Sequence, residues 1–468
     1  MKTPLTIKET QQGLLKKEFS VVELVDNYLE QINTFDKDLN IFITVTSEVA
    51  YKCAKETDEI VKNNKEDILE KLPLLGVTAA YKDIFLTKGV RTTAASKVLE
   101  SYVPSYSATS VERITKAGGM MIGKLNCDAW AHGSSGENSD FGVTKNPWDK
   151  EYIPGGSSSG SGAALSANMS LVTTGTDTCG SIRLPANYGG LVALKPTYGA
   201  VSRYGVIAMA SSLDTVGPLG RTTDDVERVF DVIKGEDGYD ATVINKEPQK
   251  IKPKDKIRIG VPKEFFVDGI DSEVASTVEN AKKALEKEGV EFVEVSLPST
   301  KRAISVYYII QPAEVSSNLG RFDGIRYGND RDSFGQEAKR RIMLGTYVLS
   351  SGYYDAYYAK AMKVRSIIIN EVNTVFENVD AIIAPVAPTP PFKIGEKAND
   401  PLKMYLTDVY AATANLCGIP SLALPFGFSK QGLPLGFQIM GPRFSENVLF
   451  YLGNLFEKTT GYVPKVAI

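Results

Sequence analysis

The stretch between Pro154 and Pro196 constrains the fold more than any other part of the chain. It consists largely of glycine, serine, threonine and alanine, with few large side chains. Flexible linkers share this composition, but this stretch also contains the apolar runs 171–172 and 191–194. Segments of small residues can approach one another closely, because glycine has no Cβ. We therefore expect buried, tightly packed loops around a site.

The rest of the chain alternates strand-like and helix-like segments. Ser20 with Glu23 and Thr109 with Glu112 have the spacing of helix capping boxes, the second in a helix that ends before Gly118. Such alternation is typical of a mixed or mostly parallel sheet covered by helices. We expect an α/β fold with one large domain. The predicted strands cover 74–80, 120–122, 256–261, 290–295, 381–384 and 433–440, and the other predicted helices lie within the first forty residues, over 271–288 and over 445–457.

We expect the single domain to span residues 1–468 and to contain four parts. These are an N-terminal helical segment (1–70), a catalytic core with the Gly/Ser-rich stretch (76–220), an exposed connector rich in Lys, Pro and Asp (241–256), and the remainder of the sheet with a substrate-binding part (257–468).

Composition excludes several classes of function. With 468 residues and a net charge of −3, the chain lacks the cationic surface that autonomous nucleic-acid binding needs. No apolar run approaches the ~20 residues of a membrane span, and the first residues contain no apolar signal segment. The four cysteines have no paired spacing, which argues against disulfides and a zinc site. We expect a cytoplasmic protein without a metal site.

The chain contains one histidine, His132, so any Ser-His or Cys-His mechanism must use it. Residues 156–160 match G-x-S-x-G, but in that fold the histidine follows the serine. We interpret His132 as a polar residue that is hydrogen-bonded beside a Gly/Ser loop, and Cys179 as a small packed residue rather than a thiolate. Residues 118–125 resemble a P-loop but lack its final Ser or Thr.

If a nucleophilic serine exists here, lysine is the realistic base. Lys82 ends a predicted strand, and two Gly/Ser loops follow it, at 155–161 and 175–183. No Ser-x-x-Lys motif is present, which excludes the lactamase arrangement.

These motifs resemble the amidase signature family. The resemblance is carried by G-G-S-S-S-G-S at 155–161, G-T-D-T-C-G-S-I-R at 175–183 and L-K-P-T at 194–197. Within the family, the chain is most similar to the A subunits of the glutamyl-tRNA(Gln)/aspartyl-tRNA(Asn) amidotransferases. The similarity covers nearly the whole chain, and its supporting stretches are 198–205, 210–214, 316–319, 339–345 and 351–358.

The resemblance implies a triad in which Ser181 is the nucleophile, Ser157 relays the proton and Lys82 is the base. Lys82 must then be neutral, which near pH 7 requires a pKa about 3 units below the usual value of about 10.4. The implied oxyanion hole consists of backbone N–H groups, for which close approach of the chain is essential. Cys179 stands where the family usually has glycine. The implied donors are the N–H groups of Thr178, Cys179, Gly180 and Ser181.

The resemblance also implies a substrate, glutamine. Arg341 would hold its α-carboxylate and Asp408 its α-amino group; surface ion pairs are the alternative for both. A tyrosine of the pair Tyr307-Tyr308 would line the pocket, and Tyr307 is the favoured one. No cofactor is expected in this chain. The ammonia would pass to a B subunit that holds ATP, magnesium and the misacylated tRNA, with a small C subunit completing a heterotrimer.

Two alternatives to this function stay open. A free-standing amidase acting on a simple amide would need no partner. A catalytically inactive scaffold protein within such a complex is the other alternative, and Cys179 is the one feature that favours it.

Overall fold

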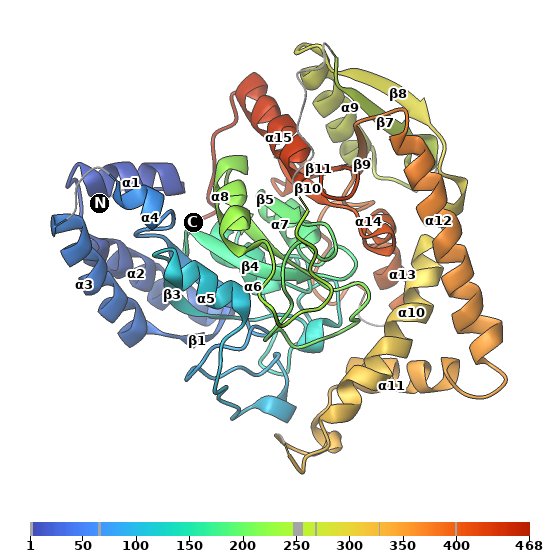
Figure 1. Ribbon diagram of the computed structural model, residues 1–468, viewed down its shortest axis with the longest axis horizontal. Coiled ribbons are helices and arrows are strands. Elements are labelled where there is room, and N and C mark those ends of the chain that lie inside the picture. The colour runs from blue at the N-terminus through green and yellow to red at the C-terminus, as the bar shows by residue number, and fades with distance from the viewer. Residues whose placement is uncertain (1–2, 64–66, 247–255, 267–268, 327, 398–399) are drawn as a thin grey trace.

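The computed structural model describes residues 3–63, 67–246, 256–266, 269–326, 328–397 and 400–468. Their strands form an 11-stranded sheet in the order β1-β3-β2-β4-β6-β5-β10-β11-β9-β7-β8 (Figure 1). The strands are β1 Phe42–Val45, β2 Thr78–Lys82, β3 Met120–Leu125, β4 Val172–Asp177, β5 Val192–Lys195, β6 Thr215–Gly220, β7 Arg258–Pro262, β8 Glu291–Val295, β9 Ala381–Pro385, β10 Ser421–Phe428 and β11 Pro434–Met440.

The sheet is mixed, as predicted, but it is not mostly parallel. β2 pairs in parallel with β3 and β4, and β7 with β8 and β9. The central strands β4, β6, β5, β10, β11 and β9 pair antiparallel with one another, as do β1 and β3. The prediction was wrong because β10 and β11 are joined by a short hairpin, which forces antiparallel pairing.

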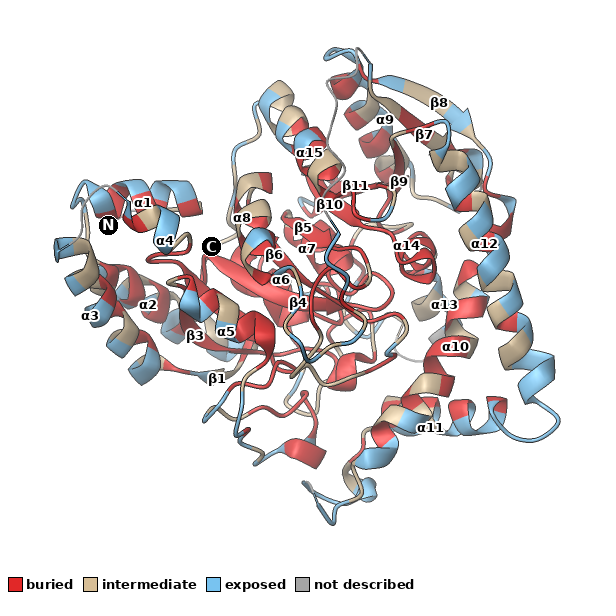
Figure 2. Ribbon diagram, viewed as in Figure 1, coloured by how far each residue is buried: buried red, intermediate tan, exposed pale blue. Residues whose placement is uncertain are grey.

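Helices cover the sheet on both faces. α6 and α7 pack together and contact β2, β4, β5 and β10. α8 and α15 form a second packed pair, which contacts β5, β6 and β10. Every residue of β4, β5 and β6 is buried, which fits strands covered on both sides. Figure 2 shows this centre as buried and the outer helix faces as exposed. The helices are α1 Ile7–Leu15, α2 Val21–Leu39, α3 Ser47–Asn63, α4 Ile68–Lys71, α5 Thr109–Lys116, α6 Ser159–Ser166, α7 Arg183–Gly189, α8 Thr223–Ile233, α9 Ser272–Glu286, α10 Ala303–Asn318, α11 Gln336–Val348, α12 Lys360–Phe376, α13 Pro401–Leu406, α14 Ala412–Cys417 and α15 Glu446–Thr460.

The helices α10, α11 and α12 stand apart from the centre of the sheet, on the right of Figure 1. α10 packs against both α11 and α12, and α14 connects this group to the sheet. No helix in the described ranges is both long enough and apolar enough to cross a membrane.

The predicted capping box of α2 is confirmed: the Ser20 hydroxyl accepts the N–H of Glu23, and the Glu23 carboxylate accepts the N–H of Ser20. The predicted capping box at Thr109 was wrong. Thr109 is the first residue of α5 rather than its cap, and its hydroxyl donates to Asp237 at 2.5 Å. Of the predicted connector 241–256, residues 247–255 lie outside the described residues.

Candidate active site

Lys82 lies at the end of β2 and is fully buried. Its side-chain nitrogen is 2.7 Å from Ser157 Oγ and 3.1 Å from Thr176 Oγ1 on β4. The Gly156–Ser157 peptide bond is cis. Burial lowers the pKa of Lys82 to about 8, although nearby groups, Cys127 and Asp128 first among them, act to raise it. A substantial fraction of Lys82 is therefore neutral near neutral pH, as a base requires.

Ser181 lies on the loop between β4 and α7 and is 6% exposed. Its carbonyl oxygen accepts the N–H of Ser158 at 3.2 Å, so the two Gly/Ser loops are in direct contact. The structure thus brings together Lys82, Ser157 and the backbone of Ser181, which are far apart in the sequence.

The Ser181 loop is fixed by a buried ion pair between Asp177 and Arg183. Arg183 Nε and Nη2 donate to the two carboxylate oxygens of Asp177 at 3.0 and 3.1 Å, and both side chains are fully buried. Arg183 also donates to the carbonyl of Ala411 and to Asn415 Oδ1. The pair locks the loop against the segment that carries Asp408.

We expect Arg183→Met to destabilise the protein by about 3–5 kcal/mol, because it leaves the Asp177 carboxylate buried without its cation. Denaturant unfolding of wild type and variant measures this loss. Arg228→Met is the matched control, since Arg228 forms an exposed pair with Asp224 that is expected to contribute at most about 1 kcal/mol. Equal losses of unfolding free energy in the two variants would contradict the conclusion that the buried Asp177–Arg183 pair fixes the Ser181 loop.

One of the four implied oxyanion donors is engaged elsewhere in this structure. The N–H of Gly180 donates to Asp177 Oδ1 at 2.7 Å, which leaves Thr178, Cys179 and Ser181 as candidate donors. The Cys179 side chain is buried, and burial followed by the charge of Asp408 raises the pKa of its thiol well above the usual value. The thiol is therefore protonated, in agreement with a packed residue and not a nucleophile.

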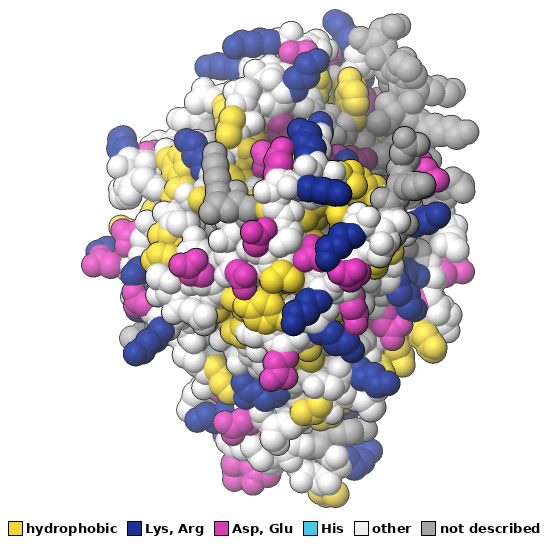
Figure 3. Space-filling model, turned by 90° about the vertical axis from the view of Figure 1, so that its left-hand side faces the viewer, with side chains coloured by type: hydrophobic (Ala, Val, Ile, Leu, Met, Phe, Trp, Pro, Cys, Tyr) yellow, Lys and Arg dark blue, Asp and Glu magenta, His cyan; other side chains and the backbone are white. Residues whose placement is uncertain are grey.

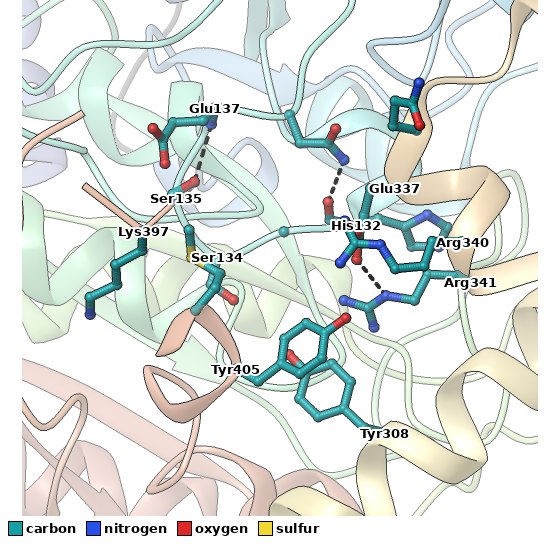
Figure 4. Close-up of a pocket in the computed structure, with 14 residues that line it drawn as sticks. His132, Ser134, Ser135, Glu137, Tyr308, Glu337, Arg340, Arg341, Lys397 and Tyr405 are labelled. Atoms are coloured by element: carbon teal, nitrogen blue, oxygen red, sulfur yellow. Dashed lines mark hydrogen bonds and ion pairs between the residues drawn. The ribbon is translucent and has the colours of Figure 1, made fainter. Parts of the chain in front are cut away.

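A cavity of about 210 Å³ opens beside these loops (Figure 4). A backbone hydrogen bond joins the cavity wall to the first Gly/Ser loop: the N–H of Gly156 donates to the carbonyl of Ser134. Its wall includes His132, Gly133, Ser134, Ser135, Glu137, Asn138, Tyr308, Gln336, Glu337, Arg340, Arg341, Lys397, Met404 and Tyr405.

Arg341 lies in the cavity wall, and Asp408 lies directly behind that wall, where it is hydrogen-bonded to two wall residues, Ser134 and Tyr308. Arg341 is buried, its Nε donates to Glu337 at 2.7 Å and its Nη1 to Gln311 at 2.6 Å. Asp408 accepts hydrogen bonds from the hydroxyls of Ser134 (2.7 Å) and Tyr308 (3.2 Å). Burial raises the pKa of Asp408 to about 7. Arg341 forms an ion pair with Glu337 at 2.7 Å, but this pair is largely buried rather than on the surface, and Asp408 forms none with the described residues.

Tyr308, rather than the Tyr307 favoured from sequence, belongs to the cavity wall. The guanidinium of Arg341 lies 4.8 Å from the centre of the Tyr308 ring, and Tyr405 stacks on the same ring at 3.8 Å. Tyr307 is buried and meets Tyr308 edge-on at 4.9 Å. The sequence therefore pointed to the right pair of tyrosines but to the wrong member of it, and Tyr405 and Ser134 were missed.

The interpretation of His132 was wrong. Its ring is buried and forms part of the cavity wall, but neither ring nitrogen has a hydrogen-bond partner among the described residues. Burial and the nearby Arg341 lower its pKa well below the usual value, so the ring is neutral.

The mixed sheet with its buried Lys–Ser pair and Gly/Ser loops defines the amidase class. The chain belongs to the amidase family, whose sequence model matches residues 23–450. It is 47% identical to the A subunit of the glutamyl-tRNA(Gln) amidotransferase from Geotalea daltonii, with 98% of each chain covered. The crystal structure of the corresponding protein from Thermotoga maritima is 41% identical, with a TM-score of 0.81 over 97% of this chain and 94% of that one. A peptide amidase bound to the inhibitor chymostatin is 27% identical, with a TM-score of 0.84 over 97% of each chain.

Proposed function

We propose that this chain is the glutamine-hydrolysing subunit of a tRNA-dependent amidotransferase. The observation that carries the proposal is a buried cation, Arg341, in the wall of a cavity whose other wall residues hold the buried carboxyl group of Asp408 by hydrogen bonds. This cavity lies beside the loop that carries Ser157 of the Lys82–Ser157 pair. A free amino acid carries a carboxylate and an ammonium group on one carbon, so it needs a cation and an anion at its binding site. Two relatives that are 47% and 46% identical over 98% of the chain are named as A subunits of the glutamyl-tRNA(Gln) amidotransferase.

In the mechanism that we propose, neutral Lys82 accepts the proton of Ser157 while Ser157 accepts that of Ser181. The Ser181 oxygen attacks the carboxamide carbon of glutamine, and backbone N–H groups of residues 178, 179 and 181 stabilise the oxyanion. The proton held by Lys82 then returns through Ser157 to the leaving nitrogen, which departs as ammonia. Water attacks the resulting glutamyl ester by the reverse relay, and glutamate leaves.

The short contact of Lys82 with Ser157 supports this relay, because a base must lie within hydrogen-bond reach of the proton that it accepts. The uncharged hydroxyl of Thr176 is a second hydrogen-bond partner that holds the Lys82 side chain in place. The lowered pKa of Lys82 has burial as its main cause, so burial itself activates the base.

We further propose that the ammonia is used by a B subunit, with a small C subunit in the complex, and that ATP, magnesium and the misacylated tRNA bind mainly there. The face of the chain that Figure 3 shows is consistent with that division. In the view of Figure 3, onto the side where α1–α3 lie in Figure 1, basic and acidic side chains are interspersed. No group of three or more His, Cys, Asp or Glu residues in the described part of the chain could hold a metal ion.

Ammonia release from glutamine and from a simple amide, butyramide, tests the substrate. We expect Arg341→Met to lower kcat/KM for glutamine about 10–100-fold, because it removes a charge-assisted hydrogen bond of about 1.5–3 kcal/mol, and to leave kcat/KM for butyramide within about twofold. Asp408→Asn is expected to act in the same way through the α-amino group. Rapid turnover of butyramide and none of glutamine by the wild type would instead establish a free-standing amidase.

A further inference from the structure

The loop 132–134 runs along the cavity between the two charged residues of the substrate site. At one end, the Ser134 hydroxyl donates to Asp408 Oδ2 at 2.7 Å. At the other end, His132 lies by Arg340 and Arg341, as Figure 4 shows. Tyr308 contacts the same two charged residues: its hydroxyl donates to Asp408, and its ring packs against the Arg341 guanidinium. An amino acid bound between Arg341 and Asp408 therefore has its carboxylate at the His132 end.

Arg341 by itself is an incomplete partner for a carboxylate. Its Nε and Nη1 already donate to Glu337 and Gln311, and no described residue accepts a hydrogen bond from its Nη2. A carboxylate has two oxygens and about four acceptor positions, so a second donor beside Arg341 is needed to satisfy a buried one.

His132 has the properties of that second donor. It is 1% exposed, yet both ring nitrogens are without a partner among the described residues, although its carbonyl oxygen accepts the side-chain N–H of Asn138 at 2.7 Å. Leaving a buried polar group unpaired destabilises the folded protein. Such a group beside a cavity indicates a partner that arrives with the ligand. The neutral imidazole carries one N–H, which suits an anionic oxygen.

We propose that His132 is a specificity-determining residue that donates a hydrogen bond to the α-carboxylate of the substrate, alongside Arg341. The proposal rests on the proposed function, since it takes the substrate to be a free amino acid. It assigns to the carboxylate two donors of different kinds, the charged guanidinium and the uncharged imidazole. An amide without a carboxylate gains nothing from His132.

Steady-state kinetics of the assembled amidotransferase with glutamine and with butyramide test this assignment. We expect His132→Leu to raise KM for glutamine about tenfold with kcat within about twofold, and to leave kcat/KM for butyramide unchanged, because the lost interaction is made equally in the ground and transition states. His132→Asn and His132→Gln place an amide N–H near the positions of Nδ1 and Nε2, and one of them should restore most of the affinity. His132→Leu should also unfold no earlier than the wild type on heating, because it removes unpaired buried nitrogens.

An unchanged KM for glutamine in His132→Leu would overturn the assignment, as would equal losses with both substrates, which indicate a purely structural role. These outcomes can be distinguished from a failure of the proposed function, because in that case the wild type itself would release no ammonia from glutamine. That result would overturn the assignment as well.

Discussion

Ser181→Ala is expected to lower kcat for glutamine hydrolysis by about 10⁴–10⁶-fold, the largest single effect in the chain. Removing the nucleophile of a serine hydrolase abolishes the covalent route and leaves only the contribution of binding and oxyanion stabilisation. The substitution deletes one oxygen from a residue that is only 6% exposed, so the fold should persist. Ammonia release by the assembled complex measures the loss, and heating measures the stability.

Ser161→Ala is the matched control, since Ser161 is also a buried serine of the Gly/Ser-rich stretch and its hydroxyl donates to the carbonyl of Thr174 at 3.0 Å. We expect it to lower stability by about 1 kcal/mol and to leave hydrolysis nearly unchanged. Adding an ammonium salt to the Ser181→Ala complex should restore amide formation on the tRNA, because the partner needs only ammonia. Retained hydrolysis in Ser181→Ala would refute the nucleophile, and a wild type that releases no ammonia from any amide would favour the inactive scaffold.

The parts of the site that sequence could predict are those that lie on short, specific motifs. Ser157 and Ser181 sit in Gly-rich loops whose composition itself requires close packing, and Lys82 ends a strand whose apolar residues are all buried. Each of these signals is local, so it is readable from a few consecutive residues. These signals led to Lys82 and the two loops, whereas the choice of Ser157 and Ser181 within the loops depended on the family resemblance, as did Arg341 and Asp408.

The parts that sequence could not predict depend on how separate elements face one another. Adjacent residues on a helix differ by about 100° in direction, so nothing in the pair Tyr307-Tyr308 tells which ring reaches the cavity. The unpaired ring of His132 is likewise a property of its surroundings, because a histidine beside a Gly/Ser loop is ordinarily hydrogen-bonded. The antiparallel centre of the sheet was missed because β4, β5, β6 and β10, which form most of it, were not predicted as strands.

Lys82→Met is expected to lower kcat/KM for glutamine by about 10³–10⁴-fold, since it removes the proposed base while keeping much of the length of the side chain. In the wild type, the pKa of Lys82 near 8 sets the pH profile. Only the neutral amine accepts the proton of Ser157, so kcat/KM for glutamine should rise about tenfold per pH unit between pH 7 and pH 8 and level off above pH 8. Below pH 7 the dependence should be steeper, because Asp408 is protonated there as well. A profile that is flat between pH 6 and 9 would contradict Lys82 as the base.

The same substitution should stabilise the protein. The pKa of Lys82 is about 8 in the folded state and 10.5 for an ordinary lysine, so the unfolded chain binds more protons between these pH values and wild-type stability rises with pH across that window. Below pH 8 the full penalty of charging a buried lysine applies, which is about 3 kcal/mol for the lowered pKa. Methionine avoids this penalty but loses the hydrogen bonds to Ser157 and Thr176, worth about 1 kcal/mol each. We therefore expect a net gain of about 1 kcal/mol in unfolding free energy at pH 7, which falls to zero near about pH 9 and becomes a net loss of about 1 kcal/mol at pH 10. A variant that is inactive yet more stable at pH 7 separates the catalytic role of Lys82 from a structural one, because the loss of a structural lysine would lower both activity and stability.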